Sequence, residues 1–304
     1  MNIKQISILN IIILIVSSLS SSCQKLSELK IDPVAASSFV LKWDEFSPII
    51  EDFNKNDDEI YVQYIPNSKA DEFLKENIPY FNCPDPELEK TYYFRWWTFR
   101  KHIKMTPAGF IITEFLPEVS WAGKYNSICC PAGHHFYEGR WLHNQDYLES
   151  YANFWFKGGG EPRRYSFWAA NSILAFASVQ QNKNLVTSLL PFFDGNYQEW
   201  ENTHLCADGL FQQTDNRDGM EVSIGGSGKR TTINSYMIGD AEAIASIAEI
   251  TGNTSLKKIY KAKAITLKSL LLNKLWNEKA GFFETLPMNS DKLFGVREFH
   301  GYTP

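Results

Sequence analysis

Residues 232–276 read TINSYMIGDAEAIASIAEITGNTSLKKIYKAKAITLKSLLLNKLW and are the clearest indicator of fold class in this chain of 304 residues. Apolar residues recur there every three or four positions, which is the period of an amphipathic helix. We therefore predict two long helices, over residues 232–251 and 255–276. The turn Gly252-Asn253 separates them, and so short a connection predicts an antiparallel helix hairpin.

The helical period recurs upstream of this hairpin. Asp85-Pro86-Glu-Leu-Glu is a strong helix start, because a capping residue precedes a proline at the first helical position and acidic residues follow. This helix is expected to end at Met105, before Pro107. Further helices are predicted over residues 131–143, 146–156, 164–181, 185–193 and 197–204, and short strands over residues 110–115 and 282–286.

Residues 85–304 are therefore predicted to form one all-α domain. Alternating short and long loops between its helices are typical of an α/α toroid, a ring of helix hairpins whose long loops gather at one end. Stacked helical repeats are the competing architecture, but no fixed sequence period supports them. Residues 24–84 are polar and interrupted by prolines, so we expect a linker and a small irregular N-terminal region there.

The first 23 residues have the pattern of an export signal. Lys4 provides a positive start, and residues 6–16 form an apolar segment too short to span a bilayer. Cys23 follows a serine-rich stretch and resembles the lipidated cysteine of bacterial lipoproteins, although Ser20 stands where that motif usually has leucine. We expect an exported protein of a Gram-negative bacterium, either a lipoprotein anchored through Cys23 in the periplasm or outer membrane, or a product of ordinary signal peptidase.

Composition is that of a globular protein, with 44% hydrophobic residues, 21% charged residues and a net charge of −5. The acidic balance argues against a nucleic-acid partner, which requires clustered Lys and Arg. The cysteines and histidines lack the spacing of a zinc site, and the neighbours His134 and His135 point in different directions on a helix. We therefore expect neither a metal nor a cofactor.

The segment from Gly209 to Gly228, GLFQQTDNRDGMEVSIGGSG, is the strongest candidate for a functional loop. Its glycines break helical and strand periods and let the backbone approach a ligand closely. Four charged residues within seven positions, in a chain rich in aromatic residues, suggest a carbohydrate site with acid chemistry. A solvated acidic turn is the alternative, because loops collect Asp and Gly for conformational reasons alone. The charged residues are Asp215, Arg217, Asp218 and Glu221.

Three segments resemble signatures of the six-hairpin glycoside hydrolases, in the group of mannosylglycerate-hydrolase-like enzymes, trehalases and processing α-glucosidases. The segment GGGEPRRYSFWAANS, residues 158–172, is similar to a glycine-rich signature that contains arginine and ends in an aromatic-Trp-Asp-Ser element. The segment RDGME, residues 217–221, is similar to the motif that bears the catalytic acid. The third is RTTIN, residues 230–234, with the helix that follows. The resemblance implies an (α/α)6 toroid and an oligosaccharide or glycoside substrate.

The resemblance also implies roles for individual residues. Glu221 occupies the position of the general acid, where the group usually has aspartate; glutamate is one methylene longer and can deliver a proton equally well. Asp218 is the alternative acid, or a group that bonds sugar hydroxyls. Either carboxylate could instead cap or pair within its loop. Substrate contacts are expected from Arg164, Trp168, Asn171, Arg217, Trp121, Trp97 and Asn234, although Trp97 on a buried helix is more typical of core packing.

The implied reaction is exo-acting, inverting hydrolysis, in which one carboxylic acid protonates the leaving oxygen and a second carboxylate activates water. The two carboxyl groups must lie about 6.5–9.5 Å apart to admit that water. In the resembling enzymes this base is a glutamate in a late segment, and neither Glu284 nor Glu298 convincingly replaces it. We therefore expect a toroid that is truncated at its C-terminus. Two other functions stay open: a glycan-binding surface lipoprotein without catalysis, and a toroid polysaccharide lyase using His134 or His135.

Overall fold

The structure is a computed structural model that describes residues 40–304. The predicted export signal, Cys23 and the start of the predicted linker lie outside the described residues. The chain divides into two units at Phe46. Of the first unit, the described part is residues 40–46, which contain one 3-10 turn, η1 (Trp43–Glu45). The second unit, residues 47–304, holds the elements considered below.

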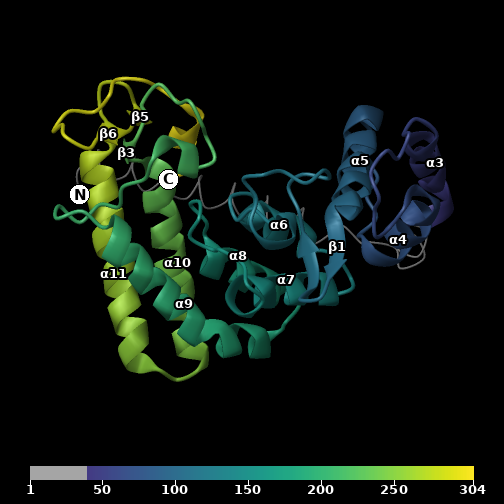
Figure 1. The fold of residues 1–304 in the computed structure, drawn as a ribbon, viewed down its shortest axis with the longest axis horizontal. Helices are drawn as coiled ribbons and strands as arrows, with labels where there is room; N and C mark the ends of the chain where they lie inside the picture. The colour runs from purple at the N-terminus through teal and green to yellow at the C-terminus, as the bar shows by residue number, and fades with distance from the viewer. Residues whose placement is uncertain (1–39) are drawn as a thin grey trace, which may run out of the picture. The chain divides into compact units, whose positions relative to one another are not determined.

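The second unit is built of helices, with only short two-stranded β-pairs among its described residues (Figure 1). The all-α prediction is therefore confirmed. The helices are α3 (Ser47–Lys55), α4 (Ala70–Asn77), α5 (Pro86–His102), α6 (Ala132–Gly139), α7 (Asp146–Lys157), α8 (Ala169–Val179), α9 (Lys183–His204), α10 (Thr231–Ile250) and α11 (Thr254–Lys274). The antiparallel strand pairs are β1 (Ile103–Thr106) with β2 (Gly109–Ile112), β3 (Gly228–Lys229) with β6 (Leu286–Pro287), and β4 (Trp276–Asn277) with β5 (Phe282–Phe283).

Helices α10 and α11 form the hairpin that the sequence predicts, and they lie side by side in Figure 1. Gly252 makes the reversal with φ +73°, a conformation that glycine adopts without strain. Asn253 then caps α11, because its side chain accepts a hydrogen bond from the Leu256 N–H at 3.0 Å. The interior face of α11 buries Tyr260, Ala264, Leu267 and Leu271.

Helix α8 begins five residues later than predicted, at Ala169. Its first turn is capped from a distant helix, since Asp240 of α10 accepts the Asn171 N–H at 2.9 Å. Asp240 also accepts the N–H groups of Ala169 and Ala170, and it is fully desolvated, so burial raises its pKa to about 7. The residues before Ala169 are thereby released from the helix to form a wall of the candidate site.

Three further predictions of local structure are wrong. The helix expected to end at Met105 ends at His102, because residues 103–106 form strand β1. The helices predicted over 185–193 and 197–204 are one helix, α9, which runs through Pro191. Phe193, Tyr197 and Trp200 are buried along one continuous face, and this packing outweighs the poor helix propensity of the residues between them. The region expected to be irregular contains α3 and α4, whose buried Ile50, Phe53, Phe73 and Leu74 are too few to give a visible period.

Within residues 40–304 no helix is both long and apolar enough to cross a lipid bilayer.

Candidate active site

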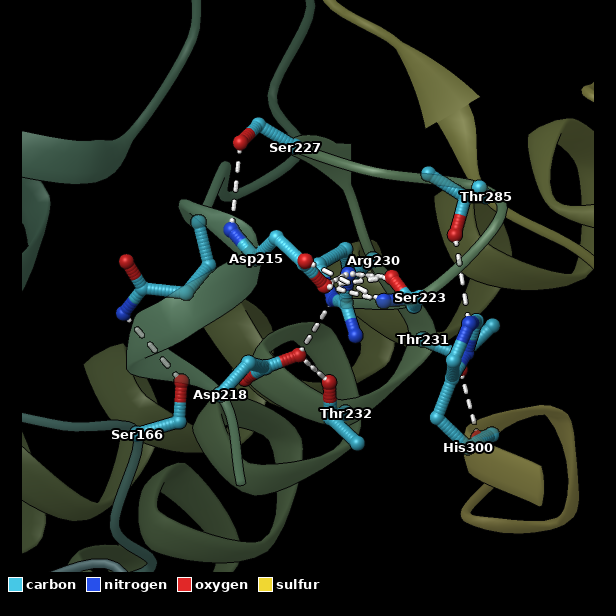
Figure 2. A network of polar contacts seen from close by, with 12 residues as sticks. Ser166, Asp215, Asp218, Ser223, Ser227, Arg230, Thr231, Thr232, Thr285 and His300 are labelled. Atoms are coloured by element: carbon cyan, nitrogen blue, oxygen red, sulfur yellow. Dashed lines mark hydrogen bonds and ion pairs between the residues drawn. The ribbon is translucent and has the colours of Figure 1, made fainter. Parts of the chain in front are cut away.

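The loop between α9 and α10 is organised around one buried arginine (Figure 2). The guanidinium of Arg230 is fully buried; its Nε donates to Asp218 Oδ2 at 2.7 Å and its Nη1 donates to Asp215 Oδ1 at 3.0 Å. Nη1 also donates to Ser223 Oγ at 2.8 Å and to the Gly226 carbonyl at 2.7 Å. Buried charges require such partners. The ion pairs therefore fix both sides of the turn that carries Glu221.

A second support comes from the C-terminal segment. The carboxylate of Glu298 accepts the N–H groups of Ile224 at 2.7 Å and Gly225 at 2.9 Å. His300 contacts Glu298 at 3.2 Å, and its Nδ1 lies 2.9 Å from the hydroxyl of Thr231 at the start of α10 (Figure 2). Glu298 thus braces the loop. Glu284 is also structural, because its carboxylate bonds Asn277 and the Gly295 N–H.

Two of the three segments that resemble glycosidase signatures, residues 158–172 and 217–221, are joined directly. The backbone N–H of Ser166 donates to the Arg217 carbonyl at 2.8 Å, and Gln213 Nε2 donates to Ser166 Oγ at 3.2 Å. The guanidinium of Arg217 lies 5.1 Å from the centre of the Tyr165 ring, a cation–π distance. Residues far apart in sequence therefore form one continuous wall.

This wall encloses a cavity of about 530 Å³, which we call the acid cavity. That volume falls in the range of small-molecule sites, about 300–1,000 Å³. Carboxylates, guanidinium groups and aromatic rings converge there, a combination that can bond sugar hydroxyls and cover the apolar face of a sugar ring. The lining residues are Glu114, Phe115, Trp121, Ile128, Cys130, Arg164, Tyr165, Asn216, Arg217, Gly219 and Glu221.

Four of the predicted site residues line the acid cavity: Glu221, Arg164, Arg217 and Trp121. Trp121 is 52% exposed and meets the Phe115 ring edge-on at 6.0 Å, so much of its indole remains available to a ligand. Arg164 is held by an ion pair with Glu161 at 2.9 Å. The structure thus brings the candidate acid, two arginines and an aromatic platform together.

The carboxyl group of Glu114 has a perturbed pKa in this cavity. Neighbouring protein atoms partly desolvate it, and this desolvation raises its pKa. The charge of Glu221 raises the pKa of Glu114 further. Glu114 is therefore close enough to Glu221 to respond to its charge.

Gly219 brings the acid-bearing turn close to the opposite wall. Its φ is +74°, and a Cβ atom at this position would lie only 2.6 Å from the Sγ atom of Cys130. A side chain at residue 219 would be strained by its backbone conformation and would also displace the wall. Glycine is therefore required two residues before Glu221 for both reasons.

Asp218 does not line the acid cavity. It is only 3% exposed, and its Oδ2 accepts hydrogen bonds from Arg230 and from the Thr232 hydroxyl. The Asp218 carboxylate therefore stabilises the turn through its pairing with Arg230. Pairing within the loop was the alternative to catalysis in the sequence analysis.

The remaining predicted contacts also lie away from the cavity lining. Trp168 packs between His134, at a ring distance of 4.8 Å, and Tyr236, at 4.3 Å. The Asn171 side chain accepts a hydrogen bond from Tyr137 at 2.7 Å. Trp168 is the N-cap residue of α8, and Asn171 lies in the first turn of that helix.

Trp97 and Asn234 form hydrogen bonds outside the lining of the acid cavity. Trp97 is buried in α5, and its Nε1 donates to Asn54 Oδ1 at 2.8 Å. Asn234 is fully buried, with its amide bonded to the N–H and carbonyl of Phe211 at 2.8 Å and to the Arg230 carbonyl at 2.7 Å. It closes the base of the loop, whereas Trp97 belongs to the packing of α3 against α5.

Glu114 and Tyr165 are cavity residues that the sequence reasoning missed. Glu114 is the second residue after the apolar strand β2, and Tyr165 lies inside one of the quoted signatures. A carboxylate close to the end of an apolar strand is the signal that could have identified Glu114.

The histidine considered for a lyase does have a tyrosine partner, since His135 Nδ1 lies 3.2 Å from the Tyr151 hydroxyl. Tyr151 is fully buried, however, and burial raises its pKa well above the usual value. Burial lowers the pKa of His135 to about 3. A proton-abstracting tyrosine must reach the substrate, so this pair is unsuited to lyase chemistry.

Known proteins share the family and the fold of this chain. The profile of the mannosylglycerate hydrolase MGH1-like glycoside hydrolase domain matches residues 124–304, which include Arg164 and Glu221. A solved structure described as a sialidase superposes with a TM-score of 0.83 and 43% sequence identity, over 86% of this chain. The chain spans 25% of the length of that protein. A search of curated proteins found no match.

Proposed function

Because the chain belongs to the MGH1-like glycoside hydrolase family, we propose that its acid cavity hydrolyses a terminal glycosidic bond of an oligosaccharide or glycoside, with Glu221 as the general acid. The observation that carries this proposal is the convergence of Glu221, Arg164 and Trp121 on one cavity. In this scheme Glu221 protonates the leaving oxygen. Water attacks from the opposite face of the sugar ring, with inversion at the anomeric carbon, and the proton that this water loses passes to solvent.

The cavity residues have distinct tasks in this proposal. Trp121 covers the apolar face of the sugar, and the Arg164 and Arg217 guanidinium groups donate to its oxygen atoms. Glu114 accepts hydrogen bonds from sugar hydroxyls at the edge of the site. Two arginines in one cavity are also suited to a carboxylated sugar, and the similar solved structure carries the name sialidase. Sialosides therefore belong among the test substrates.

The test is hydrolysis of 4-nitrophenyl glycosides, disaccharides and sialyl conjugates by the full-length chain, with NMR detection of the anomer first released. Glu221→Gln should lower kcat at least ~100-fold, the lower end of the contribution of a positioned acid. Glu118→Gln is the matched control, because Glu118 is exposed and is not among the cavity residues. Equal activity of the two variants would remove Glu221 from the mechanism, and release of the retained anomer would contradict inversion.

We also propose that the protein is exported and lipidated at Cys23, on the strength of the sequence pattern of residues 1–23. Metabolic labelling with a radioactive fatty acid should mark the wild-type protein and leave the Cys23→Ser variant unmarked. Label on the variant would place the modification elsewhere, and an unlabelled wild type in the soluble periplasmic fraction would indicate ordinary signal cleavage.

A further inference from the structure

A second cavity of about 350 Å³ adjoins the acid cavity, and Glu114 lines both. We call it the α5 cavity, because its remaining lining comes from α5, β2 and α6 and from the residue after β2. The lining residues are Arg95, Thr98, Phe99, His102, Ile112, Thr113, Glu114, His135 and Glu138. Glu114 is therefore the residue that the two cavities share.

The α5 cavity presents polar groups in fixed orientations. The Nδ1 atom of His102 donates to the Thr113 carbonyl at 2.9 Å, since a carbonyl oxygen can only accept. Burial lowers the pKa of His102, which keeps the ring neutral at pH 7 and leaves Nε2 as a hydrogen-bond acceptor. The buried hydroxyl of Thr113 has no hydrogen-bond partner within residues 40–304.

Arg95 supplies donors at the mouth of this cavity. Its Nε and Nη2 atoms bond the two carboxylate oxygens of Glu138, at 3.2 and 2.8 Å, which holds the guanidinium plane in one orientation. A guanidinium has five N–H groups, so three remain for a ligand. The ionised lining groups are one arginine and two glutamates, and this negative balance disfavours an anionic ligand.

We propose that the α5 cavity is a second sugar subsite, which takes an uncharged hexose ring linked to the sugar in the acid cavity, with Glu114 between the two rings. Hydroxyl groups that both donate and accept match the mixture of Arg95 donors and the His102 acceptor. Neutral sugars also match the lining charge. The inference rests on the proposed function for the identity of the first ring, but it concerns binding and is separable from catalysis.

The test compares binding of methyl hexosides and the corresponding disaccharides of glucose, mannose and galactose by isothermal titration calorimetry on the full-length chain. In the wild type, one disaccharide should bind at least ~10-fold more tightly than its methyl hexoside, which corresponds to about 1.4 kcal/mol. Thr98→Phe places a ring in the α5 cavity and should abolish this advantage. Arg95→Met, at an exposed side chain, removes donors with little risk to folding and should reduce the advantage.

Thr91→Phe is the matched control, because Thr91 lies on the exposed side of the same helix. Both threonine hydroxyls donate to a backbone carbonyl of α5, Thr91 at 2.7 Å and Thr98 at 2.8 Å. The control should retain the full disaccharide advantage. An unchanged advantage in both Thr98→Phe and Arg95→Met, or no advantage in the wild type, would overturn the subsite. Disaccharide binding without hydrolysis would keep the subsite and overturn the proposed function, and absence of all sugar binding would overturn both.

Discussion

The backbone N–H of Ser166 donates a hydrogen bond to the carbonyl oxygen of Arg217 at 2.8 Å. This contact joins the loop before α8 to the acid-bearing loop between α9 and α10. Arg217 ends the short 3-10 helix η4 (Asp215–Arg217), whereas Ser166 lies in an irregular segment. This bond and the one from Gln213 to the Ser166 hydroxyl join the two loops. The acid cavity is lined by residues of both loops, among them Tyr165 and Arg217.

The Cys130 contact of Gly219 leads to a first prediction. Gly219→Ala should cost on the order of 1–2 kcal/mol in free energy of unfolding through its left-handed backbone. It should also lower ligand affinity, because the new Cβ meets Cys130. Gly226→Ala is the control for backbone strain, since residue 226 has φ +60° and nothing within 4 Å of a Cβ. Chemical denaturation and calorimetry should show similar stability losses, with the affinity loss confined to residue 219 and partly reversed by adding Cys130→Ala.

A second prediction concerns the buried ion pair of Arg230 and Asp218. Arg230→Met leaves the Asp218 carboxylate buried without its cationic partner and should cost roughly 3–5 kcal/mol in free energy of unfolding. Adding Asp218→Asn removes the uncompensated charge and should recover part of this loss. Lys69→Met breaks the exposed pair with Glu72 and should cost far less, because solvent screens both charges. Urea titrations measure all three, and equal losses in Arg230→Met and Lys69→Met would contradict the structural role of the buried pair.

The cap of α8 gives a prediction of pH dependence. Burial raises the pKa of Asp240 to about 7 in the folded state, whereas an unfolded aspartate titrates near ~3.9. The folded state therefore binds the extra proton between these values, and the contribution of Asp240 to stability, complete below pH ~4, is lost as pH rises toward 7.

The histidines His135 and His102 have the opposite effect on stability. Burial lowers their pKa in the folded state, so their contribution to the free energy of unfolding increases as pH rises. The informative quantity is therefore the difference in unfolding free energy between wild type and Asp240→Asn, in which the histidine contributions cancel. As pH rises from 5 to 7.5, the wild type should lose unfolding free energy relative to Asp240→Asn, by on the order of 1 kcal/mol or more. A difference that does not vary with pH would show that Asp240 is ionised throughout this range.

The sequence by itself determined the helical class of the protein, the α10–α11 hairpin and the start of α5. These features depend on contacts within a few residues, such as the apolar stripe of α11 and the cap of Asp85 on the Glu87 and Leu88 N–H groups. Motif resemblance also identified the loop that carries Glu221. Such local signals are fully present in the order of the residues.

Only the tertiary structure decided which side chains face the cavity. Asp218 and Glu221 are three residues apart in the same acidic loop, yet the buried Arg230 holds the first behind the wall while the second faces the cavity. Glu114 lines the cavity because β2 ends close to it. Asn234 does not line the cavity, because its amide is hydrogen-bonded to Phe211 at the base of the loop. Long-range ion pairs and hydrogen bonds outweigh local preference at these positions. The partners named here are 12 and 23 residues apart, so no local pattern in the sequence records them.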